Sequence, residues 1–336
     1  MFVSSILRTI TSEEDQHRFV LIVFIFTIEV PLFLLVYHTS LNTKPSDYKV
    51  LQVERPVELL PEKNSSFSSD STIESETILF RTIRSHGLFL CTFLFATNWF
   101  RIGIYFFPYI YPNLLVNSPS LCLLQSYFLH VSTLFHLNIT ISIHLFWHYC
   151  FVSSKYWQHI TYSRLLIYLL CIFFFLCLLT WPIVSNEWTS SRFDRILQIC
   201  TVNYAYHFSY TFFIVSLTCL LPFLALIISH HIQMNSMERR LDKYLSTFPI
   251  KQSDENSNII DRKNQFQYAS YVILIWSLIN IILVICIHTP IDSDRMIKLI
   301  IFDTQMFAFI FDPILYIFIF RSVTIITSLR PTNVVH

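Results

Sequence analysis

Charge is scarce in this sequence. Asp, Glu, Lys and Arg make up 13% of the 336 residues, and only 2 residues are glycine. Because a soluble domain carries about 25% charged residues, this composition excludes an ordinary soluble domain. The formal net charge is +1, and the spread of apolar runs leaves no basic face, so we expect no nucleic acid among the partners.

Two further features are missing. The first apolar run starts near Phe19, is about 20 residues long and lacks the small-residue cleavage site of a secretory signal peptide. We therefore expect no cleaved signal peptide. No internal repeat is visible either, which weighs against transporter folds that are built from two inverted halves.

Hydrophobic residues, in contrast, make up 54% of the chain, and 33 residues are phenylalanine. They gather in runs long enough for a helix to cross a bilayer, which takes about 20 apolar residues. Seven such runs are present, at 19–37, 87–109, 122–151, 165–184, 207–229, 268–288 and 302–321. The sequence therefore predicts an all-α membrane protein, a seven-transmembrane-helix bundle.

The distribution of Lys and Arg predicts the orientation, since loops rich in positive charge stay in the cytoplasm. These residues gather after the first and fifth runs, and the loop after the second run has none. We therefore expect the N-terminal segment 1–18 outside the plasma membrane, a bundle over 19–321 and a cytoplasmic tail over 322–336. The segment 41–82, rich in Ser, Glu and Lys, predicts a disordered cytoplasmic loop insertion.

The last run holds an acid followed by proline, deep in apolar sequence. An ionisable side chain at that depth must face protein, water or a cation, and proline removes one helical hydrogen bond. The stretch Asp312-Pro313-Ile314-Leu315-Tyr316 resembles the NPxxY signature of rhodopsin-like G-protein-coupled receptors, with Asp in the place of Asn. The alternative is a proline kink with a stray acid. The chain thus resembles a divergent member of that family, of the peptide-receptor type common in invertebrates.

The resemblance implies a disulfide. In rhodopsin-like receptors, a cysteine at the outer end of the third helix is bridged to one in the loop before the fifth. Cys122 and Cys200 match both positions, and both lie on the predicted outer, oxidising side. The alternative is two unrelated thiols.

Other matches to the family are single residues. In the register of the family's DRY triplet the chain has Trp147-His148-Tyr149, so the tyrosine matches and His148 is the basic group that can stand in for the arginine. Trp276 occupies the place of the CWxP tryptophan, with Leu278 in the place of its proline, and Pro222 resembles the helix-bending proline of the fifth helix. Together with Asn98, Asp312, Pro313 and Tyr316, these residues form the predicted activation switch, although packing alone also explains an aromatic residue or a proline in an apolar helix.

Asn98 and Asp312 stand in exchanged places relative to the family. Asn98 lies where the second helix usually has Asp, and Asp312 lies where the seventh usually has Asn. If the two side chains face each other, the exchange preserves one carboxylate and one carboxamide. In the resembling family this centre often holds a sodium ion, so Asn98 and Asp312 are its predicted ligands here.

Apart from Arg321 at the end of the last run, three other charged residues lie within the runs: Glu29, Arg101 and Asp303. A single intramembrane charge usually marks an ion pair or a cavity. We expect Arg101 to pair with Glu29, or as second choice with Asp303. Since Asp303 lies in the outer part of the last helix, Arg101 and Asp303 are also the candidate ligand contacts.

The family resemblance implies a receptor without a cofactor or enzyme activity. It would bind an extracellular ligand, a neuropeptide or a small molecule, and engage a heterotrimeric G protein. Two alternatives remain open. A seven-span transporter or channel would use the intramembrane charges along a path. A membrane enzyme with iron would use His144 and His148, four apart on one helix face, and His230-His231, but its motif needs three dense histidine boxes.

Overall fold

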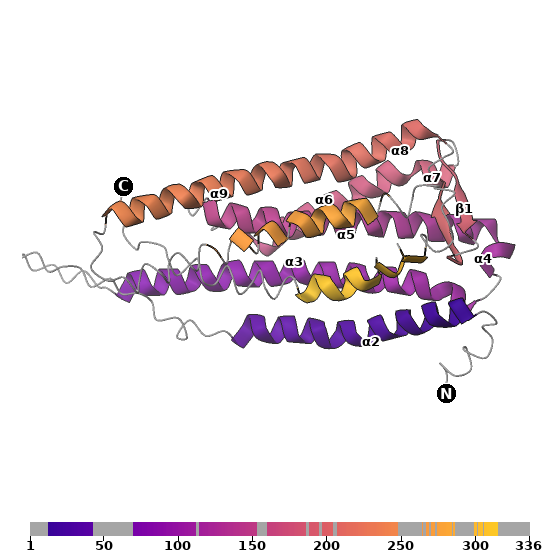
Figure 1. Ribbon diagram of the computed structural model, residues 1–336, viewed down its shortest axis with the longest axis horizontal. Helices are drawn as coiled ribbons and strands as arrows, with labels where there is room; N and C mark the ends of the chain where they lie inside the picture. Colours follow the sequence, from indigo (N-terminus) through magenta and orange to yellow (C-terminus); the bar gives the residue numbers. More distant parts are fainter. Residues whose placement is uncertain are drawn as a thin grey trace, which may run out of the picture.

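The computed structural model describes residues 13–42, 70–111, 114–152, 160–185, 188–194, 197–203 and 207–247, and parts of 264–285 and 299–314. Long helices run side by side along the axis of an elongated bundle (Figure 1). The long helices are α2 (Glu13–Asn42), α3 (Asp70–Ile110), α5 (Pro119–Val152), α6 (Tyr162–Thr180) and α9 (Leu221–Thr247).

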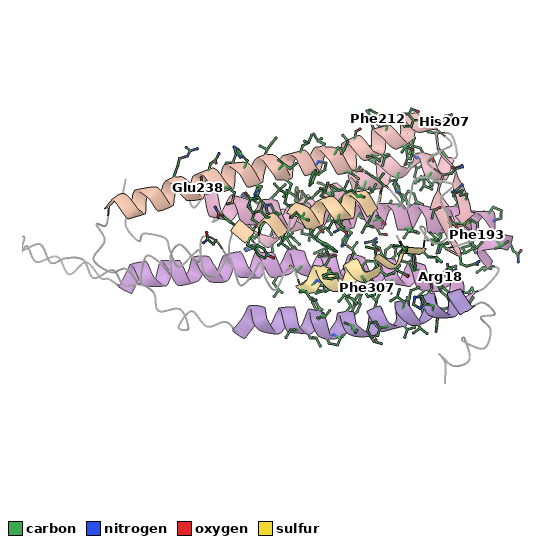
Figure 2. The ribbon with its side chains drawn as sticks, in the orientation of Figure 1. Arg18, Phe193, His207, Phe212, Glu238 and Phe307 are labelled. Atoms are coloured by element: carbon green, nitrogen blue, oxygen red, sulfur yellow. A yellow bond between two sulfur atoms is a disulfide. The ribbon has the colours of Figure 1, made fainter. Side chains whose placement is uncertain are left out.

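The short elements gather at one end of the bundle, near the start of α2 (Figure 1). They are α4 (Leu114–Asn117), α7 (Pro182–Ser185) and an antiparallel hairpin of β1 (Ser191–Asp194) and β2 (Ile199–Val202). We call this the hairpin end. Figure 2 places Phe193 of the hairpin and Arg18 of α2 at this end, and Glu238 of α9 toward the opposite end.

Five helical segments in the described part of the chain are long and apolar enough to cross a membrane: His17–Leu35, Ser85–Ile110, Pro119–Phe146, Tyr162–Ser185 and Phe208–Ile232. They coincide with the first five predicted runs. A shorter apolar helix covers Ser270–Leu283, and residues 302–304 and 306–314 are helical. The chain is therefore a helical membrane protein, and the rest of the sixth and seventh runs lies outside the described residues.

The helix α5 occupies the core. Most of its membrane-length segment is buried, whereas less than a quarter of those of α6 and of α8 (Phe208–Val215) with α9 is buried. It packs against α3, α6, α9 and β2. Its buried polar side chains are Gln125, Ser126, His130, Ser132, Thr133, His136, Thr140, Ser142 and His144. A membrane helix with so many polar groups is stable only when protein surrounds it, because lipid cannot satisfy those groups.

The start of α3 differs from the sequence prediction. Residues 70–82, which the composition assigns to a polar loop, are the first turns of this helix. No glycine or proline occurs between Asp70 and His86, so nothing in that stretch interrupts a helix. The acidic Asp70 also favours a helix start, since the N-terminal end of a helix carries partial positive charge. Residues 41–42 of the predicted loop are likewise helical, at the end of α2, and residues 43–69 lie outside the described residues.

A proline shapes the helix formed by α8, η3 (Ser216–Leu220) and α9. Pro222 has no N–H to donate to the carbonyl of Thr218, four residues earlier. The turn before it is a π-helix, and the Asn138 side chain of α5 reaches the Thr218 carbonyl with an N–O distance of 3.5 Å. A polar residue of the central helix therefore lies at the carbonyl to which Pro222 cannot donate.

Candidate functional site

Asp312 is fully buried, and both of its carboxylate oxygens have protein partners. The indole Nε1 of Trp276 donates a hydrogen bond to Oδ1 at 2.8 Å. His136 Nε2 lies 2.6 Å from Oδ2, and since a carboxylate oxygen is the acceptor, Nε2 is the donor. The carboxylate thus joins α5 to the helical residues 274–283 and 306–314. We call these three side chains the Asp312 centre.

Local contacts hold the partners of Asp312 in place. The Trp276 ring packs against Phe311, with ring centroids 5.5 Å apart. One turn after Trp276, Asn280 donates its side-chain N–H to the Trp276 carbonyl at 3.0 Å. On α5, the hydroxyl of Thr140 donates to the His136 carbonyl at 3.0 Å. The two carbonyl contacts lie within single helices, whereas the Trp276 ring packs against the helical stretch that carries Asp312.

The surroundings make the histidine contact strong. The His136 and Asp312 side chains are only 5% and 1% exposed, so water does not screen their attraction. Hydrogen bonds with a charged partner are short, and 2.6 Å is at the short end for N–H···O bonds. The acid of the last helix is thus satisfied by protein, and the stray-acid interpretation of Asp312 is wrong.

Arg101 does not form the predicted ion pair. Among the described residues, no guanidinium nitrogen of Arg101 lies within 4.0 Å of a carboxylate oxygen of Glu29 or Asp303. Its guanidinium instead lies over the ring of Phe309, 4.8 Å from the centroid. A guanidinium is only weakly hydrated and stacks well on aromatic faces, which explains why a buried arginine can take this position.

Asn98 does not contact Asp312 as predicted either. Asn98 is fully buried, and its side chain lies beside that of Glu29 on α2. Glu29 is also fully buried and within electrostatic reach of Asp312 and Arg101. Asn98 and Asp312 therefore do not contact each other. His136 lies beside Asp312, in the place that we expected for Asn98.

The described residues do not fit a sodium ion shared by Asn98 and Asp312. Both Asp312 oxygens already accept hydrogen bonds from protein donors, and the Asn98 side chain lies beside Glu29 instead. A hard cation needs several oxygen ligands that are free to turn toward it. Within the same residues, no group of three or more His, Cys, Asp or Glu side chains could hold a metal ion.

Asp303, the second candidate ligand contact, lies near the first turns of α2. Its Oδ2 is 3.9 Å from Nε2 of His17, and its side chain is 32% exposed. Arg101, in contrast, is buried on α3. The structure therefore does not join the two candidate ligand contacts, and Asp303 is the more accessible of them.

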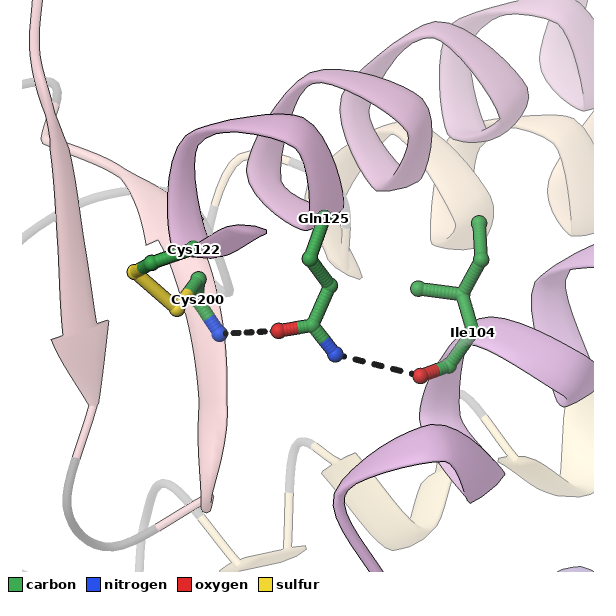
Figure 3. The surroundings of a disulfide bond; sticks show 4 residues. All are labelled: Ile104, Cys122, Gln125 and Cys200. Atoms are coloured by element: carbon green, nitrogen blue, oxygen red, sulfur yellow. Dashed lines mark hydrogen bonds between the residues drawn. A yellow bond between two sulfur atoms is a disulfide. The ribbon is translucent and has the colours of Figure 1, made fainter. Parts of the chain in front are cut away.

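At the hairpin end, Cys122 of α5 and Cys200 of β2 form a disulfide (Figure 3). Gln125, one turn after Cys122, connects the same two elements to a third. Its side-chain oxygen accepts from the backbone N–H of Cys200 at 2.9 Å, and its Nε2 donates to the carbonyl of Ile104 at 3.1 Å. That carbonyl lies four residues before Pro108, which has no N–H to offer it.

Gln125 therefore connects α3, α5 and β2 through two hydrogen bonds. The loss of these bonds should lower the stability of the protein. We expect Gln125→Leu to lower the free energy of unfolding by about 1–3 kcal/mol, because two buried backbone groups lose their partner. Leu124→Ala, at the exposed neighbouring position, is the matched control and should change it by about 0.5 kcal/mol or less. Thermal unfolding of the purified protein gives both values.

A second substitution tests the role of the proline. Pro108→Ala restores an N–H that can bond the Ile104 carbonyl within α3, so in that background Gln125→Leu should cost less. An unchanged cost would mean that the carbonyl released by Pro108 is not the group that Gln125 stabilises.

The other predicted switch residues are placed in part. Pro313 is buried in the described stretch 306–314. The backbone of α5 continues through His148 and Tyr149, but their side chains, like all of Tyr316, lie outside the described residues. Of the histidines, His144 and His230 come together, with ring centroids 6.4 Å apart, and His230 Nδ1 lies 2.7 Å from the Ser270 hydroxyl.

No protein-family model and no curated protein matches the chain. What it does is therefore inferred from its helices, its disulfide and the Asp312 centre.

Proposed function

We propose that the chain is a divergent rhodopsin-like receptor with seven membrane helices, which binds an extracellular ligand and signals to a heterotrimeric G protein. The observation that supports this most is the Asp312 centre. There the last described helix accepts hydrogen bonds from Trp276 and His136, each on a different helix. A receptor needs a contact of this kind, in which a change of helix packing breaks or remakes a small number of strong bonds.

The disulfide supports the orientation. Disulfides persist in oxidising compartments, so the Cys122–Cys200 bridge favours the hairpin end as the extracellular end. The start of α2 lies at the same end, which agrees with an N-terminus outside the plasma membrane (Figure 1). The ligand would then reach the protein near Asp303, beside the first turns of α2.

The opposite end offers a surface for a cytoplasmic partner. There α3 and α9 project beyond α2 and α5 (Figure 1). The apolar segments of these two helices are Ser85–Ile110 and Phe208–Ile232, whereas the helices extend to Asp70 and Thr247. The projecting part of α9 carries Arg239, Arg240 and Lys243. Since the DRY acid and arginine are absent, these projecting turns are the part of the chain we propose to engage the G protein.

In this mechanism the ligand stabilises one of two helix packings. A ligand at the hairpin end shifts the last helix relative to α5, and the shift changes the contacts of Asp312 with Trp276 and His136. The packing change then reaches the projecting ends of α3 and α9. To shift the equilibrium between the two packings, the ligand must bind one of them more tightly than the other.

The test is nucleotide exchange on a G protein by the purified, reconstituted chain, with a fractionated peptide extract as ligand. We expect exchange to rise with an active fraction. Trp276→Phe, which removes the indole donor but keeps an aromatic ring, should alter the exchange rate without abolishing expression. If solute enters the vesicles while nucleotide exchange stays at background for every fraction, the transporter alternative is favoured and the receptor proposal fails.

A further inference from the structure

At the hairpin end, an imidazole of α2 faces a carboxylate of the last described helix. The ring Nε2 of His17 lies 3.9 Å from Oδ2 of Asp303. An N–H···O hydrogen bond spans about 2.7–3.2 Å, so this distance is too long for one. The two side chains are therefore close neighbours that do not hydrogen-bond to each other.

The second oxygen of Asp303 also has acceptor capacity left over. Its Oδ1 is buried and, within the described part of the chain, has no hydrogen-bond partner. Leaving a buried acceptor without a partner costs free energy, and the cost is larger for a charged group. Arg18, which is buried at the same end (Figure 2), lies within electrostatic reach of Asp303. The carboxylate thus lies in a positive field, but its oxygens remain available to a ligand.

The separation of the two groups suits a shared metal ion. Zinc binds histidine nitrogen and carboxylate oxygen at about 2.0–2.2 Å in a tetrahedral arrangement, which puts neighbouring ligand atoms about 3.4 Å apart. The observed 3.9 Å exceeds this by about 0.5 Å, which a small rotation of the His17 ring covers. Since His17 is 66% exposed and Asp303 is 32% exposed, an ion from solution can reach both.

We propose that His17 and Asp303 bind a divalent transition metal ion of the zinc type, with water at its remaining positions. Imidazole favours zinc and copper over magnesium and calcium, and the carboxylate offsets part of the positive charge. The site has two protein ligands, fewer than the three or four of a typical zinc site, and Arg18 repels the cation. The ion is therefore held more weakly than a structural zinc ion and exchanges with the solution.

This site goes beyond the proposed function, because its coordination chemistry depends only on the two side chains. A bound ion would join the start of α2 to the helix that carries Asp312. In a receptor it would oppose the separation of these helices, at the end where we propose that the ligand enters. The two proposals can fail separately, since the experiment below uses the purified chain without a ligand or a G protein.

The experiment measures how metal ions protect His17 from diethyl pyrocarbonate, which acylates accessible imidazole nitrogens. Mass spectrometry of the peptides reports each histidine separately, so that His207, also exposed at the hairpin end, is the internal control. We expect zinc chloride to protect His17 at a concentration about tenfold or more below that needed for His207. Magnesium chloride at the same concentrations should protect neither, because magnesium prefers oxygen ligands.

Two variants test the role of the carboxylate. Even the loss of a group that only orients a metal ligand costs about 10–100-fold in affinity, so Asp303→Asn should raise the zinc concentration that protects His17 by at least about tenfold. Asp194→Asn is the matched control, because it removes an acid of β1 at the same end without touching the pair. It should leave the protection of His17 unchanged.

Either of two results would overturn the proposal. One is protection of His17 and His207 at the same zinc concentration, because His17 would then bind zinc as an isolated exposed imidazole. The other is unchanged protection of His17 in a folded Asp303→Asn variant, because the carboxylate would then not be a ligand. If Asp303→Asn does not fold, the comparison of the two histidines and of the two metals in the natural chain decides.

Discussion

Asp312→Ala is expected to lower the free energy of unfolding by about 3–5 kcal/mol and to remove most of the protein from the cell surface. The substitution leaves the Trp276 indole N–H and the His136 imidazole buried without their acceptor, and these two groups lie on different helices. The loss therefore includes two buried donors that no longer have an acceptor. Thermal unfolding and surface labelling measure the two effects.

Asp312→Asn is the matched control, because it keeps the shape and one acceptor oxygen for Trp276. Its loss should be smaller, about 1–3 kcal/mol, since the Trp276 bond can survive. Equal and small losses in the alanine and asparagine variants, below about 1 kcal/mol, would show that the Asp312 centre does not hold the three helices together.

The second large effect is expected from the disulfide. Replacing both Cys122 and Cys200 with serine should lower the free energy of unfolding by about 2–5 kcal/mol. The bridge joins residues 78 positions apart and fixes β2 against the start of α5, so its loss frees the hairpin end. Mass spectrometry of the non-reduced natural protein should show the two peptides linked.

The control for this variant is Cys171→Ser, at an exposed cysteine outside the bridge, which should leave stability unchanged. A double serine variant as stable as the natural chain, or two thiols open to alkylation in surface-expressed protein, would contradict the role of the bridge.

Hydropathy was sufficient to predict the first five membrane helices, because the cost of unsatisfied backbone groups in lipid fixes helix length and composition. It could not predict where α3 begins. Polar turns beyond the membrane carry no hydropathic signal, and the polar composition of residues 70–82 suggested a disordered loop. A continuous stretch without glycine or proline was the signal that favoured a helix there.

The buried acid was also found from sequence, since a carboxylate within an apolar run is expensive. Its partner His136 was not found from the sequence. Asp312 and His136 are 176 residues apart, and which of several buried polar groups an acid meets depends on the rotation of each helix. Asn98, Glu29 and His136 all lie within apolar runs, so sequence alone could not choose among them. The ionisable His136 in the middle of the third run was the signal that we missed.

The partners of Arg101 and Gln125 also could not be identified from the sequence, for two different reasons. The charge of Arg101 pointed to an acid, but a guanidinium can also be accommodated on an aromatic face, here that of Phe309. Gln125 carries no charge and gave no signal by itself. Its role follows from Pro108 on another helix, because the proline has no N–H for the Ile104 carbonyl and Gln125 donates to that carbonyl instead.

The central claim is a bundle of seven spans with the hairpin end outside the cell, and the positions of the two chain ends test it most directly. An odd number of spans places the ends on opposite sides of the membrane. Epitope tags at each end of the full chain, probed with antibodies in intact and in permeabilised cells, measure this. The account predicts that the N-terminal tag is reached in intact cells and the C-terminal tag only after permeabilisation. Both tags on the same side would mean an even number of spans and would contradict the receptor.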